Sequence, residues 1–234
     1  MLDFLIQLEK ALKLWPDNTK LSIIDLADQT GSDVPRVVQF LTDALGKTMD
    51  VHDPMTFNEI SKAHSIMIEK NRPELEERKR REEAAMIKAI KSYDHTMEKV
   101  RIMQSGKNWR SAYKTLSYFY GVHEHQLPKE LKVNVCDDCL RLGIKGNINF
   151  QELSQWLQRG IRVLMSGNGA DVIEDALDFL DAYGDYFLAD KKGEKFITNL
   201  FLALKPSCME FDLTPKLNEV AGELKLTSVM DDIL

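Results

Sequence analysis

One stretch near the middle of this 234-residue chain restricts its fold more than any other. From Pro73 to Gln104 the sequence has no glycine and no further proline, and the first half of the stretch is almost entirely charged. Acid and base stand four residues apart, with the acid nearer the N-terminus, in the pairs Glu74/Arg78, Glu76/Arg80 and Glu77/Arg81. Each such pair stabilises a solvent-exposed helix by about 0.2–0.5 kcal/mol. The stretch therefore predicts one helix of about 30 residues.

The second half of this predicted helix carries an apolar stripe. Its members recur at heptad-like spacings of four and three residues, and they are Met86, Ile90, Tyr93, Met97 and Val100. Two interpretations remain open, because the stripe can pack on the C-terminal part of the chain or pair with a second copy to form a homodimer. We therefore name Met86, Ile90, Tyr93 and Met97 as candidate partner-binding residues, on a connector that spans residues 71–105.

Residues 1–70 predict three amphipathic helices. The third helix is expected over Val34 to Leu45, with Ser32 or Asp33 as its cap and Gly46 as its stop. A small Ala27, a turn at Gly31, and apolar Val37 and Phe40 complete a pattern that resembles a helix-turn-helix. The resemblance covers about twenty residues and implies a shape rather than a ligand.

A helix-turn-helix makes DNA binding one hypothesis for the N-terminal unit. The residues that would reach base edges from the third helix are Arg36, Gln39 and Thr42. Residues 1–72, however, carry 8 Lys and Arg against 11 Asp and Glu. Because a phosphate backbone is held mainly by cations, we expect DNA-binding transcriptional regulation to be the alternative and not the main function.

Residues 106–234 predict a C-terminal bundle of five or six helices joined by short loops. We expect helices to end at Gly121, Gly143 and Gly184 and before Pro206, and to begin at the capping patterns Asn149/Glu152, Asp171/Glu174 and Thr214-Pro215.

One helix presents an acidic face formed by Asp171, Glu174, Asp175, Asp178, Asp181 and Asp185. Asp171, Asp175 and Asp178 are therefore candidate contacts for a basic partner, although a merely solvated face is the simpler interpretation.

Two cysteines and two histidines form the only short pattern that is typical of a metal site. Cys136 and Cys139 are three residues apart, and His123 and His125 precede them by eleven to thirteen residues. This order fits no common zinc module, so we expect the cysteines to be small core residues, with zinc binding or redox chemistry as lesser alternatives.

The sequence offers no Ser/His/Asp arrangement and no phosphate loop, so we expect no enzymatic activity and no cofactor. The longest nearly uninterrupted apolar run, Phe196 to Leu204, is too short for a membrane span, and the N-terminus does not read as a secretory signal. Three cysteines fit a reducing compartment, which favours the cytoplasm. The chain is thus expected to be an all-α, non-enzymatic protein-interaction protein, an adaptor or subunit of a larger assembly.

Overall fold

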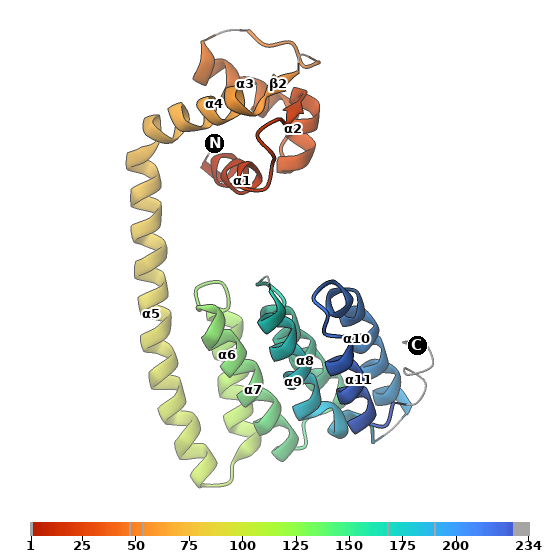
Figure 1. The fold of residues 1–234 in the computed structure, drawn as a ribbon. Coiled ribbons are helices and arrows are strands. Elements are labelled where there is room, and N and C mark those ends of the chain that lie inside the picture. Colours follow the sequence, from red (N-terminus) through yellow and green to blue (C-terminus); the bar gives the residue numbers. More distant parts are fainter. Residues whose placement is uncertain (1, 47, 53, 168, 190, 227–234) are drawn as a thin grey trace. The chain divides into compact units, whose positions relative to one another are not determined.

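A computed structural model describes residues 2–46, 48–52, 54–167, 169–189 and 191–226. Contacts divide the chain into two compact units, Met1–Glu83 and Ala84–Leu234. The described residues form eleven helices and one sheet of two very short strands (Figure 1). The prediction of an all-α fold is therefore confirmed. Among the described residues, no helix is both long enough and apolar enough to cross a membrane.

The first unit is built from four complete helices, the small sheet and the first turns of α5, which begins at Arg72. In chain order its elements are α1 (Leu2–Leu12), β1 (Lys20–Leu21), α2 (Ile23–Thr30), α3 (Val34–Leu45), β2 (Met55–Thr56) and α4 (Phe57–Lys70). The two strands are antiparallel, and Lys20 pairs with Thr56 while Leu21 pairs with Met55. The sequence predicted three helices here and no strand. The strands have only two residues each, which is too short to show an alternating pattern.

Local capping explains where the helices of this unit begin. The Asp33 carboxylate accepts a hydrogen bond from the backbone N–H of Arg36, so α3 has the predicted cap as well as the predicted limits. Ser22 and Thr56 form capping boxes at the starts of α2 and α4. Gly31 ends α2 with a φ of 62°, a backbone conformation that favours glycine.

The core of the first unit lies between α1, α2, α3 and α4. Phe4 and Phe40 meet edge to face, with their ring centroids 4.8 Å apart. Leu8, Leu26 and Leu41 are buried around them, and Trp15 is half-buried against the same core. The buried face of α4 consists of Ile60, Ala63 and Met67, at spacings of three and four residues. This periodicity is typical of a helix, but α4 was not predicted as a separate one.

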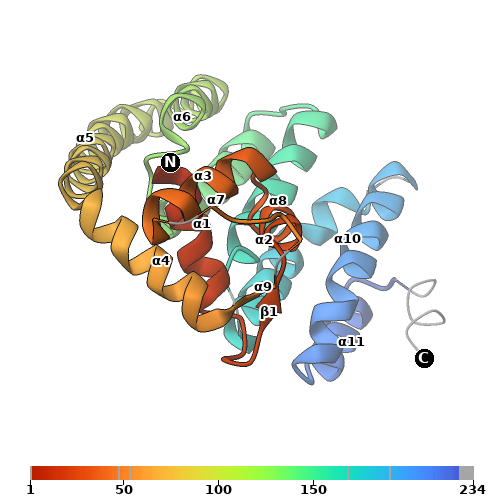
Figure 2. The same ribbon diagram turned by 90° about the horizontal axis from the view of Figure 1, so that it is seen from above.

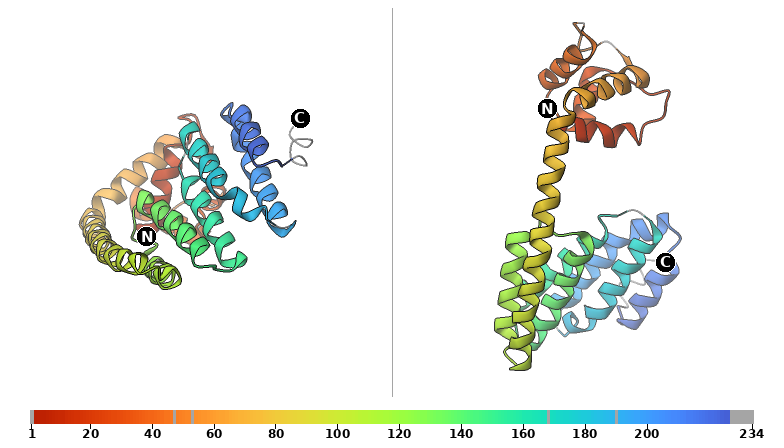
Figure 3. Two further views of the ribbon diagram at one scale, coloured as in Figure 1. Left: turned by 90° about the horizontal axis from the view of Figure 1, so that it is seen from below. Right: turned by 90° about the vertical axis from the view of Figure 1, so that its left-hand side faces the viewer.

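The second unit continues from the later part of α5 (Arg72–Ser105). Its other elements are α6 (Trp109–His123), α7 (Lys129–Lys145), α8 (Phe150–Leu164), α9 (Ala170–Phe187), α10 (Lys191–Glu210) and α11 (Thr214–Glu223). From α6 onward each helix packs against the next one in the chain, and α9 also packs against α11. Figures 2 and 3 show this succession from three further directions. The unit is therefore a stack of sequential neighbours around one core.

Four predicted helix ends are wrong. Helices α6, α7 and α9 run past Gly121, Gly143 and Gly184, and α10 contains Pro206. Gly143 and Gly184 lie inside their helices, and their lack of a Cβ leaves room for a neighbouring side chain. Leu153 occupies this space at Gly143, and Leu224 occupies it at Gly184. These two glycines therefore mark close helix packing and not helix termination. Helix α9 likewise begins at Ala170, without the predicted cap by the Asp171 side chain.

Polar side chains tie α6 to α8 inside the second core. The buried indole N–H of Trp156 donates to the hydroxyl of Tyr113 over 3.0 Å, and this hydroxyl donates to Glu152 over 3.0 Å. The Arg159 guanidinium lies over two rings, 4.8 Å from the centroid of Trp156 and 5.3 Å from that of Tyr120. These contacts fix the buried face of α8.

Candidate functional site

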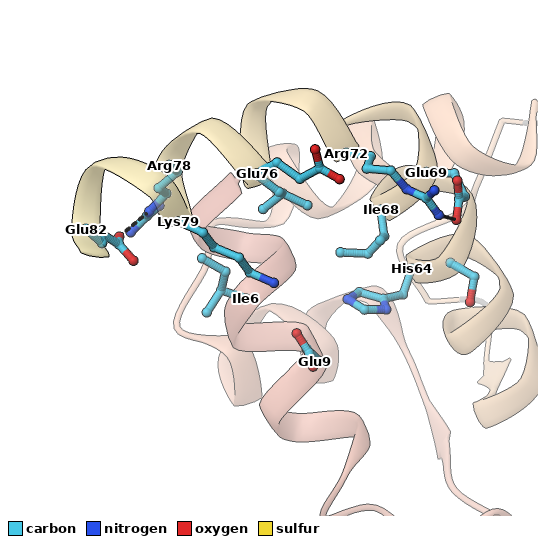
Figure 4. Close-up of a pocket in the computed structure, with 12 residues that line it drawn as sticks. Ile6, Glu9, His64, Ile68, Glu69, Arg72, Glu76, Arg78, Lys79 and Glu82 are labelled. Carbon is cyan, nitrogen blue, oxygen red and sulfur yellow. Dashed lines mark hydrogen bonds and ion pairs between the residues drawn. The ribbon is translucent and has the colours of Figure 1, made fainter. Parts of the chain in front are cut away.

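A hollow lies within the first unit, among α1, α4 and the first turns of α5 (Figure 4). It is a groove with a volume of about 770 Å³. Its lining comprises Ile6 and Glu9 of α1, His64, Ser65, Ile68 and Glu69 of α4, and Arg72, Leu75, Glu76, Arg78, Lys79 and Glu82 of α5. We call this hollow the α1–α4–α5 groove.

Three apolar side chains, one from each helix, contribute to the wall of the groove. Ile68 packs against the core of the first unit. Ile6 and Leu75 are half-buried but belong to neither core. Their apolar surface is therefore only partly removed from water within the described part of the chain. An added apolar group in the groove would gain free energy of about 25 cal/mol for each Å² of such surface it covers.

Most charged groups around the groove already have an ionic partner. Arg78 contacts Asp3 over 2.6 Å and Glu82 over 2.8 Å, and these contacts lower the pKa of Asp3 and raise that of Arg78. Arg72 pairs with Glu69. The other two acids of the lining lie near cations that are not part of it, with Glu9 2.9 Å from Lys13 and Glu76 4.0 Å from Arg80. Each lining carboxylate therefore has a cation within 4.0 Å.

Lys79 differs from the other cations of the groove. Among the residues that the structure describes, no carboxylate oxygen lies within 4.0 Å of its ammonium group. Figure 4 shows the Lys79 side chain extending over the hollow toward His64. The pKa of Glu9 is lowered mainly by the hydrogen bond from Lys13, and the more distant charges of His64 and Lys79 act in the same direction. The groove thus presents one ammonium group that no carboxylate contacts.

The two groove residues that could suggest catalysis are engaged with the backbone. His64 Nε2 lies 3.1 Å from the carbonyl oxygen of Leu5, so this nitrogen is the donor. The hydroxyl of Ser65 donates to the carbonyl of Ser61 over 3.0 Å. The hydroxyl and the ring are therefore not joined by a hydrogen bond, and the geometry of the groove is suited to binding.

The residues proposed for DNA lie on α3, away from this lining. Arg36 and Gln39 are exposed, and Thr42 is half-buried. The side-chain amide of Gln39 donates to Asp43 over 2.7 Å. Asp33, whose carboxylate caps α3, is itself exposed beside Arg36. The exposed surface of α3 therefore combines one arginine with acids, which are unfavourable near phosphate.

The candidate partner residues of α5 do not lie together on one free face. Tyr93 and Met97 pack against the core of the second unit, and the Tyr93 ring lies 5.8 Å from that of Phe119. Ile90 is half-buried, whereas Met86 is 36% exposed. The later part of α5 thus uses most of its stripe for packing within its own chain.

The acidic candidates of α9 are exposed. Asp171 and Asp175 face solvent, and Asp178 does so while contacting Lys216 of α11 over 3.0 Å. This contact and the charge of Asp178 raise the pKa of Lys216. The residues lie in the second unit and form no part of the groove.

The structure does not bring the candidate zinc ligands into one site. Cys136 and Cys139 are buried in the second core, and this burial raises the pKa of both thiols, that of Cys136 to about 12. His123 contacts Gln126 and Phe119, and His125 is exposed. In the described ranges, no group of three or more His, Cys, Asp or Glu residues could hold a metal ion. Protonated thiols are also poor metal ligands.

Sequence reasoning did not predict the groove, because its walls come from three separate helices. One signal was present. Leu75 is the only apolar residue between Pro73 and Glu83, in a run that otherwise consists of charged side chains. An isolated leucine in such a run indicates a local apolar contact, although it does not say with what.

Comparisons with protein-family models, with curated proteins and with solved structures found no match for this chain.

Proposed function

We propose that this chain is a non-enzymatic protein-interaction protein, an adaptor or subunit of a larger assembly, and that it binds a segment of its partner in the α1–α4–α5 groove. One observation carries the proposal. Ile6 and Leu75 turn apolar surface into the groove but belong to neither core of the chain. A partner that covers them would gain hydrophobic free energy without disturbing either core.

The charge around the groove favours a protein over a nucleic acid. Its lining includes the carboxylates of Glu9, Glu69, Glu76 and Glu82. Two of the three Lys and Arg side chains of the lining, Arg72 and Arg78, already contact carboxylates, and a phosphate backbone needs several cations to hold it. An apolar wall edged by paired charges is instead typical of the apolar centre and polar rim of a protein interface.

Photo-crosslinking tests this proposal. A photoreactive phenylalanine analogue is placed at Leu75 in the 234-residue chain, and at exposed Lys88 further along the same helix as the matched control. We expect crosslinks from position 75 to map to one contiguous segment of one protein, and to be lost when Ile6→Asp is added. Position 88 should give no crosslink to that segment.

Two outcomes would overturn the proposal. The first is a crosslink pattern from position 75 that is scattered over many proteins and unaffected by Ile6→Asp. The second is a salt-dependent, sequence-selective shift of duplex DNA that is lost in Arg36→Ala, since this would make DNA binding through α3 the function.

A further inference from the structure

We infer that the segment bound in the α1–α4–α5 groove is an amphipathic helix that carries an aspartate or glutamate opposite Lys79. The inference rests on the proposed function and specifies the chemistry of the partner. It follows from the shape of the groove and from the one ammonium group in its lining that no carboxylate contacts.

The shape of the groove favours a helical partner. Its lining comes entirely from α1, α4 and α5, whose internal backbone hydrogen bonds are made within each helix. No strand edge is available in this lining to pair with an extended peptide. A peptide that enters as a helix satisfies its own backbone groups and presents apolar side chains at spacings of three and four residues.

The length of the groove sets the length of that helix. Its α5 wall runs from Arg72 to Glu82, which corresponds to about 15 Å at 1.5 Å per residue. A partner helix of about three turns covers this length and places two or three apolar residues against Ile6, Ile68 and Leu75. Such a helix would occupy the open side of the three existing helices and complete a four-helix arrangement.

The charge of the groove favours an acidic edge on the partner helix. Glu9, Glu69, Glu76 and Glu82 each have a cation within 4.0 Å, so a basic partner would have to compete with an existing contact. Lys79 has no carboxylate at this distance in the described residues. A carboxylate placed opposite Lys79 therefore adds an ion pair without breaking one, and next to an apolar wall this pair is less screened than one in open solvent.

Two synthetic peptides test the inference on the 234-residue chain. Both are 14-residue helices with the same leucine stripe, and they differ only in carrying glutamate or lysine along one polar edge. Fluorescence anisotropy measures their binding to the unaltered chain and to Lys79→Glu, Lys88→Glu and Leu75→Ser. Lys88→Glu makes the same charge change on the same helix outside the groove, and far-UV circular dichroism checks that each variant is folded.

We expect the glutamate peptide to bind the unaltered chain about tenfold more tightly than the lysine peptide. Lys79→Glu should abolish or reverse this preference, and Lys88→Glu should leave it unchanged. Leu75→Ser should weaken both peptides by a similar factor, because both use the same apolar wall.

Failure of the inference differs from failure of the proposed function. If both peptides bind equally, with or without Lys79→Glu, and both are weakened by Leu75→Ser, the groove binds proteins but the acidic edge is wrong. If neither peptide binds at millimolar concentration, or if Leu75→Ser has no effect, both statements are wrong. Dimerisation of the chain that is lost in Leu75→Ser would show that a second copy occupies the groove, and would also overturn the inference.

Discussion

At the scale of single residues, the hydroxyl of Tyr113 makes two hydrogen bonds that hold α8 against α6. It accepts from the indole of Trp156 and donates to Glu152. Burial is the main cause that raises the pKa of Tyr113 to about 12, so the hydroxyl keeps its proton and remains a donor at neutral pH. Trp156 is almost fully buried, so its N–H is left without a partner in the core if this acceptor is removed.

Tyr113→Phe should therefore destabilise the second unit by about 1–3 kcal/mol, because it leaves the buried N–H of Trp156 without an acceptor. Urea unfolding monitored by circular dichroism measures the change. Tyr118→Phe on the same helix is the control, since Tyr118 is 77% exposed, and it should change stability by less than about 0.5 kcal/mol. Equal effects of the two substitutions would contradict the role given to Tyr113.

Residue-scale predictions from the sequence succeeded where the determinant is local. Asp33 was expected to cap α3 and does so, because capping depends on residues that are adjacent in the chain. The bond from Trp156 to Tyr113 joins residues 43 positions apart, and no sequence spacing indicated it. The sequence also predicted that Cys136 is a small core residue, and the fold confirms this by placing it in the second core.

At the scale of helices, glycine has two opposite effects in this chain. Gly193 lies in the first turn of α10, where an added Cβ would overlap the carbonyl group of Phe187 at the end of α9. A backbone carbonyl cannot rotate away as the end of a side chain can. Gly121 lies within α6, and nothing is within 4 Å of the position that its Cβ would occupy.

Gly193→Ala should accordingly destabilise the chain by about 1–3 kcal/mol through steric overlap. Gly121→Ala should stabilise it by about 0.5–1 kcal/mol, because alanine loses less conformational entropy in a helix and meets no neighbour. Thermal unfolding of the two variants beside the unaltered chain measures both signs. A stabilising effect of Gly193→Ala would mean that α9 and α10 do not approach each other as closely as described.

Helix positions were largely predictable, and helix ends were less so. The absence of glycine and further proline from Pro73 to Gln104, together with the paired charges, predicted the helix over Arg72–Ser105 to within a residue at each end. The predicted ends near Gly143 and Gly184 were wrong, because the sequence alone does not distinguish a glycine that permits close packing from one that ends a helix. Only the neighbouring side chain, Leu153 or Leu224, distinguishes the two.

At the scale of the whole molecule, the described residues form two separate cores. One surrounds Phe4, Leu8 and Phe40, and the other includes Leu157 and Phe201. The sequence treated residues 71–105 as a connector, whereas the contacts divide α5 between the two units after Glu83. Because each core is complete within its own unit, each unit should unfold with its own free energy.

Leu8→Ala should then lower the stability of the first unit by about 2–5 kcal/mol and leave the second unit unaffected, and Leu157→Ala should do the reverse. Hydrogen exchange with mass spectrometry resolves the two effects, since amides of α1 to α4 and of α6 to α9 fall in different peptides. Faster exchange throughout the chain in either variant would contradict independent unfolding.

The groove shows why a site can be harder to predict than the fold that carries it. Ile6, Ile68 and Leu75 come from three helices, and only Leu75 stood out in its local sequence. The fold also decides which charged side chain lacks an opposite charge nearby. Arg78 and Lys79 are neighbours in sequence, but Arg78 contacts Asp3, 75 positions away, and Lys79 contacts no carboxylate among the described residues.

The three tryptophans give the two units separate optical signals. Trp15 belongs to the first unit and is partly accessible to water, whereas Trp156 lies beneath the guanidinium of Arg159 in the second, where Trp109 is also found. With phenylalanine in place of Trp109 and Trp156, indole emission would come from the first unit alone. The protein can thus report on the folding of its first unit without an added dye.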